Sequence, residues 1–486
     1  MHRPAYAGRS QQKKTKKRIA MSVELLAPLA DWSSLDTWIV ITAALAAMAC
    51  TLPGCYLVLR GQSMLGDALS HTVLPGIAGA FFVTHGLRSA GLISHEAYTA
   101  SWHAAIFAGA VAIGIATAVL TEAVQKLGGV ESSAALGVVY TSLFALGLLL
   151  IRLTADLVDL DPGCVLYGSI ETVVLDTVPG TLIPRAAVTN GAVLVINLLL
   201  VALFFKELRI ATFDPSLATT LGIHASLIQY ALTAATAVTL VAAFESVGSI
   251  LVIAMLIVPA ATALIVTDRL GAMVPVSLVV AAFCAFLGHV LAIVIPPAVF
   301  GPLGFDSVLD ASTAGMMAVA AGLVFVVAML ASPTRGVVSQ AVRLALLRLR
   351  IACEDVLGLL YRLEEMHPQE QAASVLDLAP QFLGKGKFAT RLALYKLRRE
   401  NKIVAVGDGY RLTDTGRAAA AGIVRSHRLW ESYLSAHFNL RGAREHELAH
   451  RTEHYIGPEL REELASELGE PGVDPHGRDI PPTAAR

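Results

Sequence analysis

The feature that most constrains this chain is a series of apolar runs between residues 36 and 332. A helix of roughly 17–25 residues crosses about 30 Å of hydrocarbon, so runs of that length predict membrane-spanning helices. Only 15% of the residues are charged, against about 25% in an average soluble domain, which excludes an ordinary soluble enzyme. We predict nine spans, at residues 36–59, 64–83, 103–122, 134–150, 186–206, 226–243, 247–266, 272–297 and 312–332.

The basic residues between the spans indicate an orientation. The chain after residue 332 is long and charged, and we expect it in the cytoplasm. Positively charged loops favour the cytoplasmic side, and this orientation places four basic residues there: Arg60, Lys126, Lys206 and Arg209. Nine spans then put Lys13–Arg18 outside, so either the number of spans is off by one or the true start is Met21, which we favour.

Two ionisable residues stand four apart in the second predicted span, in the run GQSMLGDALSHTVLPG. On a helix, Asp67 and His71 share one face, with Cβ atoms about 6 Å apart. Such groups are unfavourable in a membrane unless they pair or line a polar path, and together they supply half of a divalent-cation site with oxygen and nitrogen ligands. The alternative is an Asp–His hydrogen bond that joins two helices. Glu245 and His289 have simpler interpretations, as a water-exposed turn and a packing residue.

A short polar segment, FDPSLATTLGI at residues 213–223, interrupts the apolar runs. Asp214 can cap a short helix, Pro215 suits its first turn and Gly222 can end it. We expect this segment on the cytoplasmic side, where a short rigid helix would suit the docking of a partner. The alternative is a plain connecting loop.

Three stretches together resemble the permease subunit of the metal-ion ABC importers, which take up manganese, zinc or iron: GCYLVLRGQSMLGDALSHTVLPGIAGA, DPSLATTLGI and VGSILVIAMLIVPAATA. The resemblance implies that Asp67 and His71 lie on the translocation path and gate the metal. It also implies a coupling helix that contacts the ATPase, with Asp214, Pro215, Ala218 and Gly222 in it. The expected partners are an ABC ATPase, an extracytoplasmic metal-binding protein, a second permease subunit (a copy or a relative) and membrane lipid. The sequence has no GxxxxGK[ST] pattern, so this chain is not itself an ATPase.

The tail contains a pattern typical of a winged helix-turn-helix. Val375–Ala420 predicts a helix, a turn and a second helix, followed by two short strands, IVAV and YRLT, around GDG. In such a module the second helix enters the major groove of DNA. The basic residues predicted to contact DNA are Lys385, Lys387, Arg391, Lys396 and Arg398. The alternative is a module used for protein contacts, with these residues facing solvent or phospholipid.

Histidine and glutamate residues recur at helical spacing further on. His427 and Glu431 are four apart, and the second group recurs at i, i+4, i+7 and i+8 on one helix face: His446, His450, Glu453 and His454. Imidazole and carboxylate ligands on facing helices suit Mn²⁺, Fe²⁺ or Zn²⁺. The alternative is a charged helix face exposed to water.

Residues of about 350–482 resemble the iron- and manganese-responsive repressors of the diphtheria-toxin-repressor family, through LTDTGRAAA, VRSHRLWE, HELAHRTEH and DPHGRDIP. The resemblance implies one metal site at His427, Glu431 and His446. It implies a second at His450, Glu453 and His454, with Asp355 from the first helix. His450 stands where the family usually has Cys or Glu, and Gly358 stands where some manganese-responsive members have Glu, which leaves the metal preference open.

We therefore predict an all-α polytopic protein of the ABC importer permease type in the cell (inner) membrane, with a cytoplasmic winged-helix and helical metal-binding/dimerisation domain. The predicted parts are a leader at 1–35, the transmembrane domain at 36–332, a linker helix at 333–349, the winged helix at 350–422 and the metal-binding domain at 423–486. The favoured function is import of Mn²⁺, Fe²⁺ or Zn²⁺, with the tail sensing metal and regulating transport. The alternatives are a membrane-tethered or proteolytically released repressor, and a degenerate permease that only anchors a metal sensor.

Overall fold

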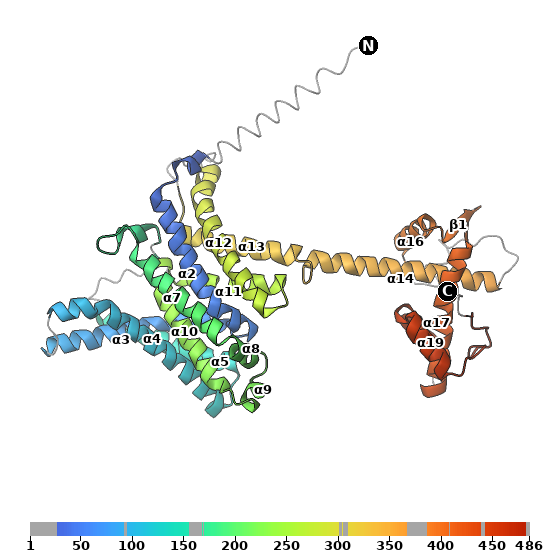
Figure 1. Cartoon of the computed structure of the whole chain (residues 1–486), viewed down its shortest axis with the longest axis horizontal. Helices are drawn as coiled ribbons and strands as arrows, with labels where there is room; N and C mark the ends of the chain where they lie inside the picture. Colours follow the sequence, from blue (N-terminus) through green and yellow to red (C-terminus); the bar gives the residue numbers. More distant parts are fainter. Residues whose placement is uncertain are drawn as a thin grey trace, which may run out of the picture. The chain divides into compact units, whose positions relative to one another are not determined.

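The computed structural model describes residues 27–91, 95–154, 168, 170–300, 304, 310–366, 386–407, 409–438 and 443–482. The chain divides into two compact units, Met1–Ser339 and Gln340–Arg486. In Figure 1 the first unit runs from blue to yellow and the second from orange to red.

The first unit is a bundle of long helices, one at each of the nine predicted segments: α2 (Ser34–Leu59), α3 (Met64–Ser89), α4 (His95–Gly128), α5 (Ser132–Thr154), α7 (Arg185–Leu203), α10 (Ala225–Val247), α11 (Ser249–Val266), α12 (Leu270–Phe300) and α13 (Thr313–Ala331). Among the described residues, seven of them are long and apolar enough to cross a membrane, and α11 is a shorter apolar helix. The remaining helix, α3, is the one that carries Asp67 and His71.

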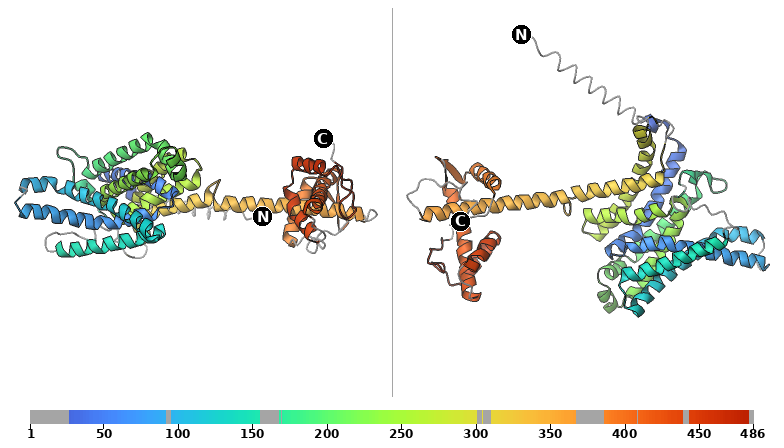
Figure 2. Two further views of the ribbon diagram at one scale, coloured as in Figure 1. Left: turned by 90° about the horizontal axis from the view of Figure 1, so that it is seen from below. Right: turned by 180° about the vertical axis from the view of Figure 1, so that it is seen from behind.

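Helices α3 and α4 extend beyond the predicted spans 64–83 and 103–122: α3 continues to Ser89, and α4 begins at His95 and continues to Gly128. They lie side by side, as the two views of Figure 2 show. The described residues of this unit also include four short helices: η1 (Ala27–Asp31), η2 (Ile170–Leu175), α8 (Phe205–Phe213) and α9 (Pro215–Thr220).

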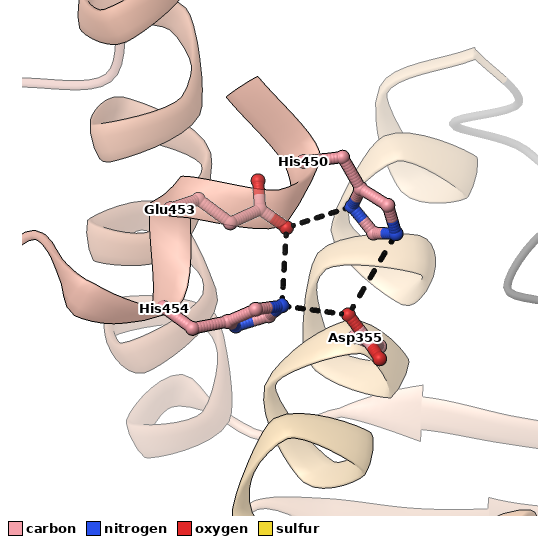
Figure 3. A group of neighbouring side chains, drawn as sticks. All are labelled: Asp355, His450, Glu453 and His454. Atoms are coloured by element: carbon pink, nitrogen blue, oxygen red, sulfur yellow. Dashed lines mark hydrogen bonds and ion pairs between the residues drawn. The ribbon is translucent and has the colours of Figure 1, made fainter. Parts of the chain in front are cut away.

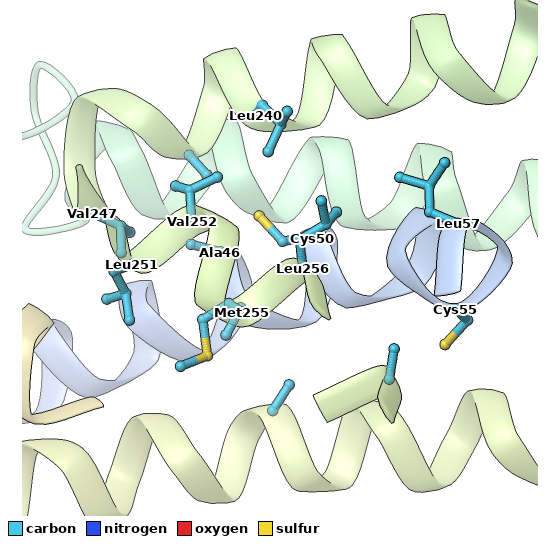
Figure 4. Packing of buried hydrophobic residues seen from close by; sticks show 14 of the residues in the cluster. Ala46, Cys50, Cys55, Leu57, Leu240, Val247, Leu251, Val252, Met255 and Leu256 are labelled. Carbon is cyan, nitrogen blue, oxygen red and sulfur yellow. The ribbon is translucent and has the colours of Figure 1, made fainter. Parts of the chain in front are cut away.

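The core of the first unit forms where α2 and α11 approach closely (Figure 4). A Cβ on Gly54 would lie 1.8 Å from the backbone oxygen of Leu256, so only glycine permits this approach. One turn away, the Thr51 hydroxyl donates to the backbone oxygen of Met255 at 2.8 Å. Small residues and a hydroxyl therefore hold these helices together, as expected where hydrophobic burial cannot drive helix association.

The two ionisable residues that the sequence places alone in apolar runs, Glu245 and His289, both lie on helices. His289 is buried, with Nδ1 3.0 Å from Thr313 Oγ1 and Nε2 3.3 Å from Asp36 Oδ1, which confirms it as a packing residue. Glu245 lies in the last turn of α10, before the break at Gly248 (φ +77°), rather than in the turn itself; its side chain is outside the described residues.

The second unit contains α14 (Val337–Met366), α16 (Lys387–Arg399), the antiparallel strands β1 (Ile403–Val406) and β2 (Gly409–Leu412), α17 (Asp414–Phe438), α18 (Ala443–Thr452), η4 (Glu453–Tyr455) and α19 (Pro458–Glu467). Its core packs α14, α16 and the two strands together through Val356, Leu360, Leu394, Leu397, Ile403 and Leu412. The predicted hairpin is thus present. The predicted first helix of the helix-turn-helix, and Lys385, lie outside the described residues.

Two predicted boundaries fall inside helices. The linker at 333–349 extends into the first turns of α14, which then continues into the core of the second unit. The boundary between 422 and 423 lies within α17, a single helix of 25 residues. The winged-helix and metal-binding parts therefore share one helix.

Candidate metal sites

The first candidate site is the Asp67–His71 pair of α3. His71 Nε2 lies 3.5 Å from Asp67 Oδ1, and each side chain is 37% exposed. The imidazole packs on two aromatic rings of α5, Tyr140 (stacked, centroids 6.2 Å apart) and Phe144 (edge-on, 5.5 Å). The carboxylate and imidazole belong to one helix, so their mutual contact does not join two helices. Both groups remain accessible, and together they offer one oxygen and one nitrogen atom of the kind that binds divalent cations.

The short segment after α8 forms the predicted capped helix. The Asp214 carboxylate accepts a hydrogen bond from the backbone N–H of Leu217 at 2.9 Å, and this bond lowers the pKa of Asp214. Pro215 occupies the first turn, and Gly222 follows the helix with a φ of +81°, which favours glycine. Ala218 is buried, while Leu217 and Leu221 are about half exposed. The helix α9 thus presents apolar side chains on a rigid, capped turn.

The second unit brings together the predicted first group. His427 and Glu431 come from α17, where both are buried, and His446 comes from α18, where it is 58% exposed. Glu431 Oε1 lies 3.1 Å from His427 Nε2 and 2.7 Å from His446 Nδ1. The ligand atoms of the three residues all lie within 4.8 Å of one another.

The predicted second group also converges (Figure 3). Asp355 extends from α14 toward His450 of α18 and toward Glu453 and His454 of η4. His454 Nε2 lies 3.0 Å from Asp355 Oδ1, and His450 Nδ1 lies 3.0 Å from Glu453 Oε1. Again the four ligand atoms lie within 4.8 Å of one another. Two imidazoles and two carboxylates at this separation fit the donor set of Mn²⁺, Fe²⁺ or Zn²⁺.

Glu453 faces both groups. One carboxylate oxygen, Oε1, contacts His450, while the other, Oε2, lies 2.6 Å from His427 Nδ1 in the first group. Its side chain is only 3% exposed. The two groups therefore form one continuous network of imidazoles and carboxylates.

Charge within this network shifts several pKa values. Burial disfavours ionisation of Glu453, but hydrogen bonds from His427 and His450 outweigh it and lower the pKa of Glu453 to about 2. The pKa of Glu431 falls in the same way. Burial lowers the pKa of His454, but hydrogen bonds to Asp355 and Glu354 outweigh it and raise that pKa to about 9. Without metal, the proton on His454 therefore offsets part of the negative charge of the carboxylates.

Two residues of this network were not predicted. Glu354 Oε2 lies 2.9 Å from His454 Nδ1, the ring nitrogen that does not face Asp355, so it fixes the orientation of the ring. Arg362 lies 3.7 Å from Glu453 Oε2. Glu354 adjoins Asp355 in sequence, which is the only signal that could have suggested it, whereas nothing in the spacing suggests Arg362.

Four of the five basic residues predicted to contact DNA lie on α16, and the fifth, Lys385, is outside the described residues. Lys387, Arg391 and Arg398 are exposed, and Lys396 is partly exposed and pairs with Glu400 at 3.9 Å. Ala393, Leu394 and Leu397 of the same helix are buried in the core. The structure thus gathers these cations on the accessible side of α16.

Two family models match the chain. The ABC 3 transport family matches residues 35–332, and the iron dependent repressor metal binding and dimerisation domain matches residues 413–482. The manganese transport system membrane protein MntD of Bacillus subtilis is 39% identical over 313 residues, which cover 64% of this chain and 96% of that protein. The zinc transport system membrane protein TroD of Treponema pallidum is 40% identical over 313 residues, 64% of this chain and 78% of that protein.

Among solved structures, PsaBC from Streptococcus pneumoniae in complex with Fab is 27% identical over 64% of this chain and 97% of that chain, with a TM-score of 0.48. The manganese regulator SloR is 30% identical over 27% of this chain and 60% of that chain, with a TM-score of 0.25. The family match covers more than half of the residues, and MntD is matched over almost its whole length. This chain therefore belongs to the ABC 3 transport family and carries, in the same polypeptide, a domain of the iron dependent repressor type.

Proposed function

We propose that residues 35–332 form the permease of an importer for divalent transition-metal ions, with Mn²⁺ as the first candidate substrate. The observation that carries this is the accessible Asp67–His71 pair in a helix of the membrane domain. An oxygen and a nitrogen ligand suit Mn²⁺, Fe²⁺ and Zn²⁺. The names of the relatives in Bacillus subtilis and Treponema pallidum, which refer to manganese and zinc, support the same substrate class.

The expected assembly follows from this function. A separate ABC ATPase docks on α9, whose exposed Leu217 and Leu221 provide an apolar contact. A second permease subunit completes the path, an extracytoplasmic metal-binding protein delivers the ion, and the second unit lies in the cytoplasm. The membrane is the cell (inner) membrane.

The test is uptake of ⁵⁴Mn²⁺ by cells that express the full transporter with Asp67→Ala. We expect uptake to fall to background because the carboxylate ligand is gone. Asp310→Ala, which removes a described acid far along the sequence, is the matched control and should retain uptake. Unchanged uptake in Asp67→Ala would favour the alternative of a degenerate permease that anchors a sensor.

We further propose that the second unit senses the imported ion and limits transport. The support is the convergence of seven imidazole and carboxylate residues from α14, α17, α18 and η4 in one network. Bound metal would neutralise the carboxylates in place of protons. The residues that would hold it are those of the two groups: His427, Glu431 and His446 in the first, and Asp355, His450, Glu453 and His454 in the second. In metal-replete cells, Glu453→Gln should therefore raise uptake several-fold. Equal uptake by the variant and the native chain at every metal level would contradict this.

A second candidate role is metal-dependent DNA binding by the second unit, tethered or after proteolytic release. The specific observation is the accessible basic face of α16 beside the β1–β2 hairpin. Fluorescence anisotropy of the detergent-solubilised full chain with labelled promoter DNA tests it. Binding that needs Mn²⁺ and is lost in Arg391→Ala with Arg398→Ala would establish this role.

A further inference from the structure

The membrane domain contains a polar cavity of about 380 Å³ that the proposed metal pair does not occupy. It is lined by the start of α3, the end of α4, the start of α5 and the start of α10. Among its described lining residues, ten carry side-chain oxygen and none is His or Cys. The lining includes Ser226, six residues after the end of α9. The cavity therefore lies at the end of the membrane domain that carries the proposed coupling helix.

Helical register connects this cavity with the Asp67–His71 pair. On α3, Met64, Asp67 and His71 are spaced i, i+3 and i+7 and share one face; Met64 lines the cavity. Three residues correspond to about 4.5 Å along a helix, so the pair begins one turn beyond the cavity.

Helix α5, which packs against α3, also has one face that runs from the cavity to the Asp67–His71 pair. On α5, Leu136, Tyr140 and Phe144 are spaced i, i+4 and i+8, so they too share one face. Leu136 lines the cavity, while Tyr140 and Phe144 pack on the His71 ring. The same two helix faces thus border the pair and, one turn further on, the cavity.

The cavity contains a carboxylate with an easily displaced partner. Glu122 of α4, 24% exposed, forms an ion pair with Lys126 and accepts a hydrogen bond from the Tyr230 hydroxyl of α10. Lys126 is 72% exposed. An ion pair with so exposed an ammonium contributes little, so a divalent cation can take the place of Lys126.

We propose that this cavity is the release site of the transported ion and that Glu122 is its principal ligand there. The inference rests on the proposed transport function. The ion leaves Asp67 and His71 for a site that is rich in oxygen ligands and has no imidazole among its described lining residues, where Tyr230 positions the carboxylate. Hard oxygen ligands without imidazole hold a divalent transition-metal ion less tightly than a mixed site, which suits release.

The test compares Glu122→Gln with Lys126→Gln in ⁵⁴Mn²⁺ uptake by the full transporter. If Glu122 is a ligand, Glu122→Gln should lower the maximal rate at least tenfold with little change in KM, and Glu122→Asp should restore part of it. Lys126→Gln should lower the maximal rate far less than Glu122→Gln, because it leaves the carboxylate in place. If the ion pair only joins turns of α4, both changes should have equal effects, which would overturn the proposal.

Two further measurements separate the outcomes. The amount of monodisperse transporter extracted from membranes is determined for each variant, and rates are expressed per folded complex, so loss of protein does not imitate loss of rate. Asp67→Ala is measured in parallel. Loss in Asp67→Ala with full activity in Glu122→Gln would overturn the release site and leave the transport function intact, whereas activity in Asp67→Ala would overturn the transport function itself.

Discussion

The two units treat the same kind of ligand in opposite ways. In the membrane domain, one carboxylate and one imidazole lie 3.5 Å apart, each more than a third exposed. In the second unit, seven such residues converge from four elements, and Glu431 and Glu453 are almost completely buried. Few, accessible ligands allow an ion to arrive and leave; many, preoriented ligands retain it. In the roles proposed for the two units, the number and burial of the ligands, rather than their type, distinguish the path from the sensor.

The largest difference between the two units is expected in the equilibrium binding of Mn²⁺. For the detergent-solubilised full chain, we expect Glu453→Gln to weaken Mn²⁺ binding about 100-fold, at the upper end of what loss of a buried ligand or its support causes in metal sites. Asp67→Asn should change it less than threefold, because the pair holds an ion only in passing. Titration calorimetry measures both. A large effect of Asp67→Asn would show that the membrane pair also retains metal.

The metal-free stability of the second unit offers the next test. Glu453→Gln should lower its free energy of unfolding by about 1–3 kcal/mol, because buried hydrogen-bonded partners, His427 and His450, lose a charged acceptor. Asp67→Asn should leave the unfolding of this unit unchanged. Chemical denaturation in chelator, followed by the fluorescence of Trp430 in α17, gives both values.

Metal binding to the second unit should release protons, and His454 is the expected source. The folded pKa of His454 is about 9, above its ordinary value of 6.5, so its contribution to metal-free stability is full below pH 6.5 and is lost as pH rises through 9. A metal ligand must be deprotonated, so metal affinity should rise over the same window, by up to about tenfold per pH unit. Calorimetry in buffers of different ionisation enthalpy measures the released protons. Affinity that falls as pH rises would contradict this assignment.

The smallest expected effect concerns α9. Asp214→Ala removes the cap of a short helix, a loss of about 1 kcal/mol, and should reduce metal-stimulated ATPase activity of the assembled transporter a few-fold. Asp214→Asn, which retains a capping oxygen, is the matched control and should be close to the native chain. Equal losses in the two variants would point to the charge rather than to the cap.

Much of this structure could be predicted because the signals are periodic. Apolar runs gave one helix for each predicted span, and the helical spacing marked the imidazoles and carboxylates of the tail as ligands. Their division into two groups followed from the family resemblance, and the shared helix face was wrong, because α18 ends at Thr452 and Glu453 and His454 lie in η4. What could not be predicted depends on contacts between distant segments. Nothing local places Glu453 Oε2 against His427, and nothing marks Arg362 as its neighbour. The boundary placed between 422 and 423 rested on a change of motif, whereas the backbone there continues as α17.

The continuity of α17 has a mechanical consequence. A helix of 25 residues is about 37 Å long, and its turns cannot slide past one another without breaking backbone hydrogen bonds. Near its start, Gly416 touches the backbone of Lys402, where a Cβ would lie 1.8 Å from the carbonyl oxygen just before β1. Further along, the same helix carries His427 and Glu431. Helix α17 therefore connects the ligands His427 and Glu431 rigidly to the β1–β2 hairpin. We expect a rotation of α17 that brings the ligands closer together to move the hairpin as well.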